Sequence, residues 1–118
     1  MSEDFVYKSK VALIGTVVSK RYNKTSAGPV VNIFTRTGNS RGQRFCIGVN
    51  LWGKPAQKLN RQLSEFGLED GTPVEEDEAP IIKVKGELRY EFWEDSDGEQ
   101  QGRYTVNASS IEICNDED

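Results

Sequence analysis

The chain has 118 residues, a formal net charge of −4, 36% hydrophobic and 29% charged residues, two cysteines and no histidine. This composition is typical of one soluble globular domain, and no apolar run approaches the roughly 20 residues that a membrane-spanning helix needs. Without histidine the chain lacks the commonest general base and metal ligand, and two cysteines alone cannot build a zinc site, so we expect no enzyme, no metal and no cofactor.

The net charge conceals an uneven distribution along the chain. Residues 5–64 hold eleven Lys or Arg and no Asp or Glu, whereas residues 65–118 hold seventeen acids and four bases. A basic half predicts a surface that attracts phosphates. The alternative is that the two halves neutralise each other in the fold.

The first half of the chain predicts three strands. Residues 10–19 are apolar and β-branched, which is typical of a strand, and a polar loop is expected over residues 20–29. Two more strands are predicted over residues 30–36 and 44–52, separated by a short turn over residues 37–43. Short turns between three strands indicate an antiparallel meander.

One helix is predicted next. Pro55 suits a first helical position, Gly67 supplies a left-handed stop, and the residues between them place apolar side chains on one face. These are Ala56, Leu59, Leu63 and Phe66. The spacing predicts that this face packs on the core.

The remaining chain predicts a loop and two strands. The loop covers residues 69–80, and its acidic run at residues 75–78 is expected to be solvated and mobile. Strands over residues 81–93 and 103–114 flank a hairpin turn at Asp97-Gly98. The order β-β-β-α-β-β predicts an all-β fold, a five-stranded OB-fold barrel with one short helix between strands 3 and 4. This single domain covers residues 1–114, and a short acidic tail follows over residues 115–118.

Strand periodicity predicts which side chains face outward, because successive residues alternate between the two faces. In the third strand Phe45, Ile47, Val49 and Leu51 are expected to face the core. The opposite face then carries Arg44, Cys46, Gly48, Asn50 and Trp52. In the fourth strand Ile82, Val84, Gly86 and Leu88 are expected inside.

Binding of a single nucleic-acid strand without reading its sequence needs exposed rings for the bases and cations for the backbone. The predicted rings are Trp52, Trp93, Phe34 and Tyr22. The predicted phosphate contacts are Arg21, Lys24, Arg36, Arg41, Arg44, Lys54, Lys85 and Arg89. Arg89 and Trp93 are expected to form a cation and ring on one face of the hairpin. Each ring also has a structural interpretation: Phe34 and Trp52 could cap the barrel, Phe92 and Trp93 could staple the hairpin, and Tyr22 could anchor its loop.

At these residues the chain resembles the bacterial and phage single-stranded DNA-binding protein family. The resemblance covers roughly residues 9–113 and is carried by Val11-Ala-Leu-Ile-Gly15, Gly28-Pro-Val-Val-Asn-Ile33, Val49-Asn-Leu-Trp-Gly-Lys-Pro-Ala56, Val84-Lys-Gly-Glu-Leu-Arg-Tyr-Glu-Phe-Trp-Glu-Asp95, Asp97-Gly98 and Arg103-Tyr-Thr105. It implies sequence-independent binding of single-stranded DNA in replication, recombination or repair, with stacking on Trp52 and Trp93. It also implies self-association as a dimer or tetramer through the first strand, and contacts with replication or recombination proteins.

The chain departs from the family pattern at several positions. Cys46 stands where the family commonly has a Trp, and Gly48 stands where an Arg commonly follows. The turn over residues 37–43 is short, and the acidic tail lacks the Pro-Phe ending of cellular members. These departures favour a phage-encoded or otherwise divergent member. In the absence of an export signal, we expect a cytoplasmic protein (host cytoplasm for a phage product), with no membrane partner and with free thiols at Cys46 and Cys114.

Two other functions remain open at this stage. An OB-fold protein-interaction module, such as a replisome or replication-restart accessory factor, would use the acidic half as its surface and bind nucleic acid weakly. A carboxylate nuclease would need a metal at the acidic run over residues 75–78.

Overall fold

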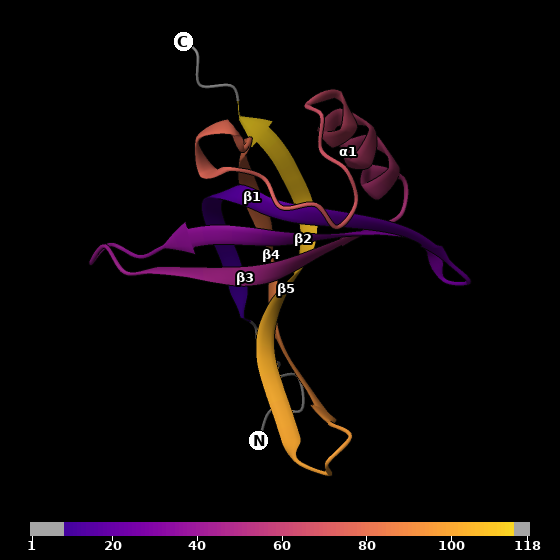
Figure 1. Ribbon diagram of the computed structural model, residues 1–118, viewed down its shortest axis with the longest axis vertical. Helices are drawn as coiled ribbons and strands as arrows, with labels where there is room; N and C mark the ends of the chain where they lie inside the picture. The colour runs from indigo at the N-terminus through magenta and orange to yellow at the C-terminus, as the bar shows by residue number, and fades with distance from the viewer. Residues whose placement is uncertain (1–8, 115–118) are drawn as a thin grey trace, which may run out of the picture.

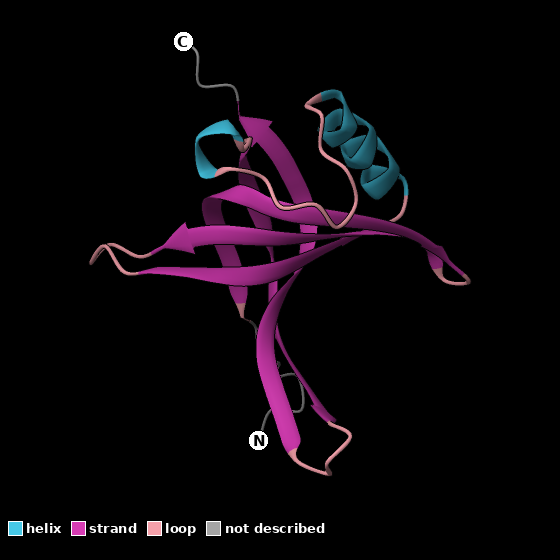
Figure 2. Cartoon of the chain, viewed as in Figure 1, coloured by secondary structure: helices cyan, strands magenta, loops and turns pink. Residues whose placement is uncertain are grey.

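Five strands close into a barrel, and one helix lies against it (Figure 1). The structure is a computed structural model that describes residues 9–114. The elements are β1 (Lys10–Thr25), β2 (Gly28–Gly38), β3 (Arg44–Trp52), α1 (Lys54–Glu65), a 3-10 turn η1 (Glu76–Glu78), β4 (Ile81–Glu94) and β5 (Gln100–Cys114). The strand order is β1-β2-β3-β5-β4, so the predicted five-stranded OB-fold architecture is confirmed, and Figure 2 shows how strand dominates it. The predicted acidic tail at residues 115–118 lies outside the described residues.

β1 is a long strand that belongs to two sides of the barrel. Its first part pairs with β4, its second part pairs with β2, and the register shifts at a bulge between Val17 and Ser19. Gly15 lies where β1 passes from β4 to β2, and it allows β2 to approach closely, because a Cβ there would collide with the carbonyl oxygen of Arg36. The loop predicted for residues 20–29 is wrong at both ends. Polar residues up to Thr25 continue β1, since β2 satisfies their backbone groups, and β2 already begins at Gly28.

β3 closes the barrel and has the predicted bounds. It pairs antiparallel with β2 along its whole length, and parallel with β5 only from Gly48 to Asn50. Val49 and Leu51 are buried as predicted, but the prediction that Phe45 faces the core is wrong, since 47% of Phe45 is exposed. By strand alternation Phe45 lies on the same side of β3 as Val49 and Leu51. It is nevertheless exposed, because it lies outside the segment from Gly48 to Asn50 that pairs with β5.

α1 covers the barrel with the predicted apolar face. Ala56, Leu59 and Leu63 are buried in the core cluster that also holds Val31, Ile33, Val49 and Ile82. The prediction for Phe66 is wrong, because the helix ends there and the ring is 51% exposed. Gly67, with φ of 91°, turns the chain so that Leu68 enters the core instead. Within residues 9–114 no helix is long and apolar enough to cross a membrane.

The segment between α1 and β4 is fastened to β1. The backbone N–H of Gly71 donates to Lys20, the N–H of Val74 donates to Val18, and the N–H of Val17 donates to Pro80, over 2.9, 2.8 and 3.2 Å. The acidic run therefore lies in a segment fixed at both ends, and part of it forms η1. The run is exposed to solvent as predicted, and Glu76 also forms the ion pairs described below.

β4 and β5 form a long hairpin that extends beyond the barrel (Figure 1). The predicted turn is confirmed: Asp95 accepts backbone hydrogen bonds from Asp97 and Glu99 at 2.9 and 3.0 Å, and Gly98 has φ of 83°. These hydrogen bonds, together with one from Gln101, lower the pKa of Asp95. The ionised carboxylate, which accepts the hydrogen bonds of the turn, is therefore favoured over the protonated form.

Candidate nucleic-acid interface

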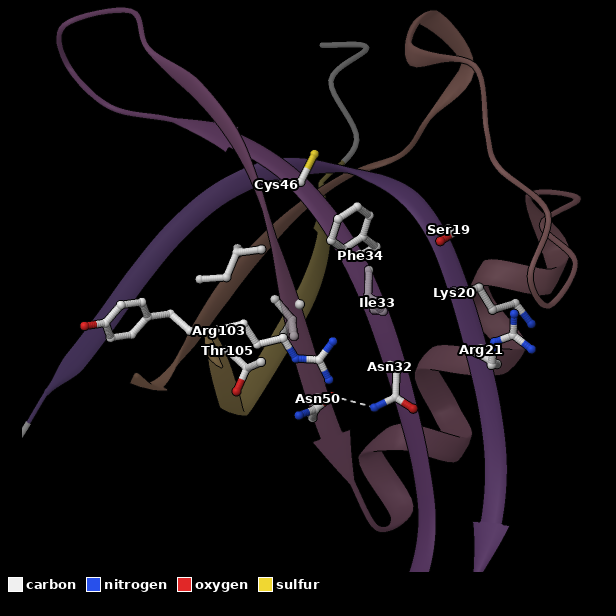
Figure 3. Close-up of a pocket in the computed structure, with 14 residues that line it drawn as sticks. Ser19, Lys20, Arg21, Asn32, Ile33, Phe34, Cys46, Asn50, Arg103 and Thr105 are labelled. Carbon is white, nitrogen blue, oxygen red and sulfur yellow. Dashed lines mark hydrogen bonds between the residues drawn. The ribbon is translucent and has the colours of Figure 1, made fainter. Parts of the chain in front are cut away.

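A groove of about 400 Å³ crosses the outer face of β1, β2 and β3 and is bounded by β5 (Figure 3). The register explains its composition, because Phe34 lies opposite Ser19 on one side and Gly48 on the other. The lining residues beside Phe34 are mostly small or polar: Ser19, Asn32, Cys46, Gly48, Asn50 and Thr105. Strand alternation therefore produces an open channel in which the ring of Phe34 is available to a ligand, and Tyr104 of β5 is also among the lining residues.

Phe34 is the exposed ring that β2 contributes to this groove. Its side chain is 47% exposed, and the residue opposite, Gly48, has no side chain to cover it. Asn32 and Asn50 lie next along the same face and hydrogen-bond to each other at 2.5 Å. A ring beside amide groups offers a base both a stacking surface and polar partners for its edge. The sequence reasoning identified Phe34 but missed the two amides, although their outward alternation was visible.

Trp52 lies on the same outward alternation of β3 as Asn50 and Gly48, at the strand end, and is 44% exposed. It is therefore accessible to a base. Lys54 follows at the start of α1, but it lines a different depression, between the helix and β5. The structure places Trp52 on the groove face and Lys54 away from the groove.

Arg103 connects the groove with the hairpin, and the sequence reasoning did not name it as a site residue. It lines the groove, and its guanidinium lies 5.4 Å from the centre of the Trp93 ring, within cation–π range. Its Nε also donates to Glu91 at 3.2 Å. The hairpin register could have found it, since Glu91 and Arg103 are directly paired and share the Trp93 face by alternation.

The predicted pairing of Arg89 with Trp93 is replaced by another arrangement. Arg89 forms an ion pair with Glu87 at 3.6 Å, and the cation over Trp93 is Arg103. Both arginines and the ring nevertheless lie on one face of the hairpin, because Arg89 pairs with Thr105 in the groove wall. Trp93 is 44% exposed and remains accessible.

Three other rings lie on the opposite face of the hairpin. Tyr90, Phe92 and Tyr104 are 55%, 66% and 60% exposed. Tyr90 packs edge-on against Tyr104 and stacks near Phe92, with ring centres 4.9 and 6.4 Å apart. Phe92 therefore does not staple the hairpin to the core.

The predicted group around Tyr22 divides between the two faces of β1. Arg21 pairs in register with Asn32 and lines the groove. Tyr22 pairs with the buried Val31 and packs partly against the core, and Lys24 shares its inward alternation near the end of the strand. The structure brings only Arg21 of these three to the groove, and the anchoring interpretation fits Tyr22.

Lys20 has a structural role. It is 5% exposed, and its Nζ donates to Asn60 and Asp70 at 2.8 and 2.7 Å. Partial burial raises the pKa of Asp70, but the Lys20 hydrogen bond, the Tyr22 backbone N–H and the nearby charges of Lys20 and Arg21 outweigh this and lower it. Lys20 thereby ties β1 to the segment around α1.

The remaining predicted cations lie at different places. Arg36 and Arg44 extend the groove face past Cys46, and both form ion pairs with Glu76, at 3.6 and 3.3 Å. Arg41 is exposed in the β2–β3 turn, and Lys85 lines depressions between β1 and β4, outside the groove.

The charge division along the sequence persists only in part. Three cations of the basic half pair with acids of the second half, namely Lys20, Arg36 and Arg44. Neutralisation between the halves therefore occurs at these three cations, whereas other cations of the basic half, such as Arg21 and Arg41, are exposed. Within residues 9–114 no cluster of three or more Cys, Asp or Glu is placed to hold a metal ion, and Cys46 and Cys114 are free thiols.

Comparison with known proteins tests the resemblance that the sequence motifs indicated. No protein-family profile matches the chain. Single-stranded DNA-binding proteins of Helicobacter pylori and Helicobacter hepaticus are both 26% identical over 106 residues, which cover 89% of this chain and 45% and 48% of theirs. The chain thus spans about half the length of the curated relatives it matches.

Solved structures show the same fold. A small single-stranded DNA-binding protein from Streptomyces coelicolor matches with a TM-score of 0.68 and 13% identity, covering 92% of this chain and 96% of that one. A mitochondrial single-stranded DNA binding protein from S. cerevisiae matches with a TM-score of 0.61 and 18% identity over the same shares. Sequence and fold together confirm the resemblance to the single-stranded DNA-binding protein family with an OB fold.

Proposed function

We propose that this chain binds single-stranded DNA without reading its sequence and performs no catalysis. The observation that carries the proposal is a groove that holds the exposed ring of Phe34 and is linked by Arg103 to Trp93, with the exposed Trp52 on the same outward alternation of β3. Rings so exposed accept any base, and the cations beside them contact phosphates. The names of the relatives and structural neighbours, all single-stranded DNA-binding proteins, agree with it.

The residues proposed to contact DNA differ in how close they lie to the groove. Trp52, Phe34 and Trp93 are exposed, with Arg21, Arg36, Arg44 and Arg89 beside them. Arg103, Asn32 and Asn50 join the set on the geometry of the groove. Arg41, Lys54 and Lys85 lie outside the groove, so we propose them as peripheral contacts, reached only if the strand continues around the barrel. Lys24 and Tyr22 contribute least.

The wider role is proposed from the same resemblance. Protection of single-stranded DNA in replication, recombination or repair, in the cytoplasm of a cell or of a phage host, fits a sequence-independent binder. Self-association through β1 fits the exposed outer side of its first part, where Ile14 is 59% exposed.

Fluorescence anisotropy of a labelled oligo-deoxythymidine tests the DNA-binding proposal. We expect saturable binding, competition by mixed-sequence single strands but not by duplex, and a log–log salt slope near −0.7 for each phosphate contacted. Binding to duplex as tight as to the single strand, or no binding at low salt, contradicts the proposal.

A protein-interaction module is the second candidate, and the exposed rings Tyr90, Phe92 and Tyr104 favour it. Tyr90 and Phe92 do not line the groove, so they are free when it is occupied, whereas Tyr104 is also among the groove's lining residues. In this case the anisotropy titration stays flat while the barrel remains folded.

A further inference from the structure

Two arginines from neighbouring strands converge on a single carboxylate. Nη1 of Arg36 lies 3.6 Å from Oε1 of Glu76, and Nη1 of Arg44 lies 3.3 Å from Oε2. Arg36 is directly opposite Cys46, and Arg44 precedes Cys46 by two residues, so both side chains start from the same outer face of the sheet. Each carboxylate oxygen therefore meets a different guanidinium.

A phosphodiester presents the same pattern to a protein. It carries one negative charge shared by two non-bridging oxygens, and guanidinium groups bind such oxygens with directed N–H donors. We propose that Arg36 and Arg44 form a phosphate subsite on the single-stranded DNA path, and that Glu76 occupies this subsite in the free protein as an internal counter-ion which the phosphodiester displaces. The inference rests on the proposed function.

The position of the subsite fits a strand that leaves the groove. Arg36 follows Phe34 by two residues on β2, so the two side chains leave the same face of the sheet from Cα atoms about 7 Å apart. Beyond them a second depression of about 320 Å³ is lined by residues that include Thr16, Arg36, Arg44 and Glu76. A base stacked on Phe34 would thus have an adjoining phosphate directed toward the two arginines.

The backbone holds Glu76 in this place. Hydrogen bonds from Val74 to Val18 and from Val17 to Pro80, at 2.8 and 3.2 Å, fix the segment to β1 on both sides of η1. The side chain of Glu76 remains 52% exposed, and that of Arg44 is 71% exposed. The carboxylate is therefore positioned over the arginines but accessible to water, which allows a competing anion to replace it.

Replacing Glu76 by its neutral isostere isolates this effect. Glu76→Gln removes the internal counter-ion, while Glu78→Gln makes the same change in net charge on the same segment, at an exposed residue for which the described chain shows no ion pair. Binding of oligo-deoxythymidine is measured by anisotropy at several salt concentrations, with circular dichroism to verify folding. We expect E76Q to bind about three- to tenfold more tightly at low salt, the range for two exposed ion pairs, and E78Q to change affinity less than twofold.

The salt dependence gives a second readout. A phosphate that no longer competes with a carboxylate makes the log–log slope of E76Q steeper, by up to about 0.7 for one contact. Adding Arg44→Gln to E76Q removes one guanidinium, and we expect it to cancel most of the gain.

Three outcomes overturn the subsite. Equal tightening by E76Q and E78Q means that only net charge matters. Weaker binding by E76Q means that Glu76 positions the arginines for DNA. An E76Q gain that persists with Arg44→Gln means that Arg44 is not involved. Failure of the wild-type protein and every variant to bind is a different result, because it overturns the proposed function itself.

Discussion

On the barrel face, Phe34 lies between strands whose registers are fixed on both sides. On the β4–β5 hairpin, Trp93 lies on a two-stranded ribbon that extends from the barrel. The barrel face carries Phe34 among amides and small residues, with Trp52 at the end of β3, whereas the hairpin carries Trp93 on one face and three exposed rings on the other. The fixed register of the barrel strands suits the barrel face to positioning a strand, while the hairpin supplies more aromatic surface.

In both regions, arginines form ion pairs with exposed glutamates. Glu76 pairs with Arg36 and Arg44 on the barrel, and Glu87 and Glu91 pair with Arg89 and Arg103 on the hairpin. Exposed pairs of this kind contribute little to stability. Under the proposed function, DNA has to compete with the protein's own carboxylates in both places, which lowers its affinity and makes the log–log salt slope shallower.

Removal of the barrel ring should have the largest effect on binding. Phe34→Ala deletes the stacking surface at the centre of the groove, and we expect it to weaken binding of oligo-deoxythymidine by about 1–3 kcal/mol. Phe66→Ala is the matched control, because Phe66 is similarly exposed but lies at the end of α1. An equal loss in both variants would remove Phe34 from the site.

Loss of the Lys20 ion pair should affect stability and not binding. Asp70→Asn leaves the Lys20 ammonium, 5% exposed, with a weaker partner, and we expect the free energy of unfolding to fall by about 1–3 kcal/mol. Chemical denaturation measures it. Glu69→Gln, a neighbouring carboxylate in the same exposed segment, should change stability little. A D70N protein as stable as wild type would show that the pair does not hold β1.

The same pair predicts a pH dependence. Because the pKa of Asp70 is lowered from 3.8 in the fold, the ionised carboxylate favours folding. Its contribution is complete above pH 3.8 and is lost as the pH falls below that value through the lowered pKa. Denaturation midpoints of wild type and D70N should therefore converge in acid. Midpoints that stay equally far apart at low pH would contradict this assignment.

Arg103 tests whether the two regions act together. Arg103→Gln removes both a cation that lines the groove and the partner of the Trp93 ring, and we expect about a fivefold loss of affinity with a shallower salt slope. Arg89→Gln removes a hairpin arginine of comparable exposure that has no contact with Trp93, and should cost less. If R89Q is the weaker binder, Arg103 does not link the regions.

Self-association should respond to the outer side of β1. Ile14→Lys places a charge on the exposed apolar position, and we expect a smaller molar mass by light scattering if β1 joins protomers. Phe66→Lys serves as the control for an exposed apolar residue elsewhere. A mass that is unchanged in I14K but reduced in F66K would contradict pairing through β1.

Sequence periodicity predicted the parts of this molecule that depend on local pattern. The bounds of β3, the buried face of α1 and the turn at Gly98 are as expected, since alternation, helical spacing and left-handed glycine act over a few residues. Residues up to Thr25 were misjudged because a polar sequence becomes a strand once β2 pairs with it. The burial of Phe45 was mispredicted, because strand alternation indicates which face of the sheet a side chain lies on but not whether another element packs over it.

The candidate site depends more on long-range pairing. Phe34 and Trp52 could be assigned from alternation alone, whereas the partner of Trp93 required the register of the hairpin. The position of Glu76 over Arg36 and Arg44 could not be predicted, since no pattern near the acidic run indicates that β1 fixes it there. Its ion pairs join positions 32 and 40 residues apart in the sequence.

Tryptophan fluorescence tests most directly whether one strand occupies both regions. Trp52 on the barrel and Trp93 on the hairpin are the only tryptophans, so Trp52→Phe and Trp93→Phe each leave one reporter and keep a ring at the changed position. Titration with oligo-deoxythymidine at low and high salt should quench both single-tryptophan variants at low salt, over the same concentration range, and less at high salt. Either variant keeping full fluorescence while anisotropy shows bound DNA would contradict a strand that spans both regions.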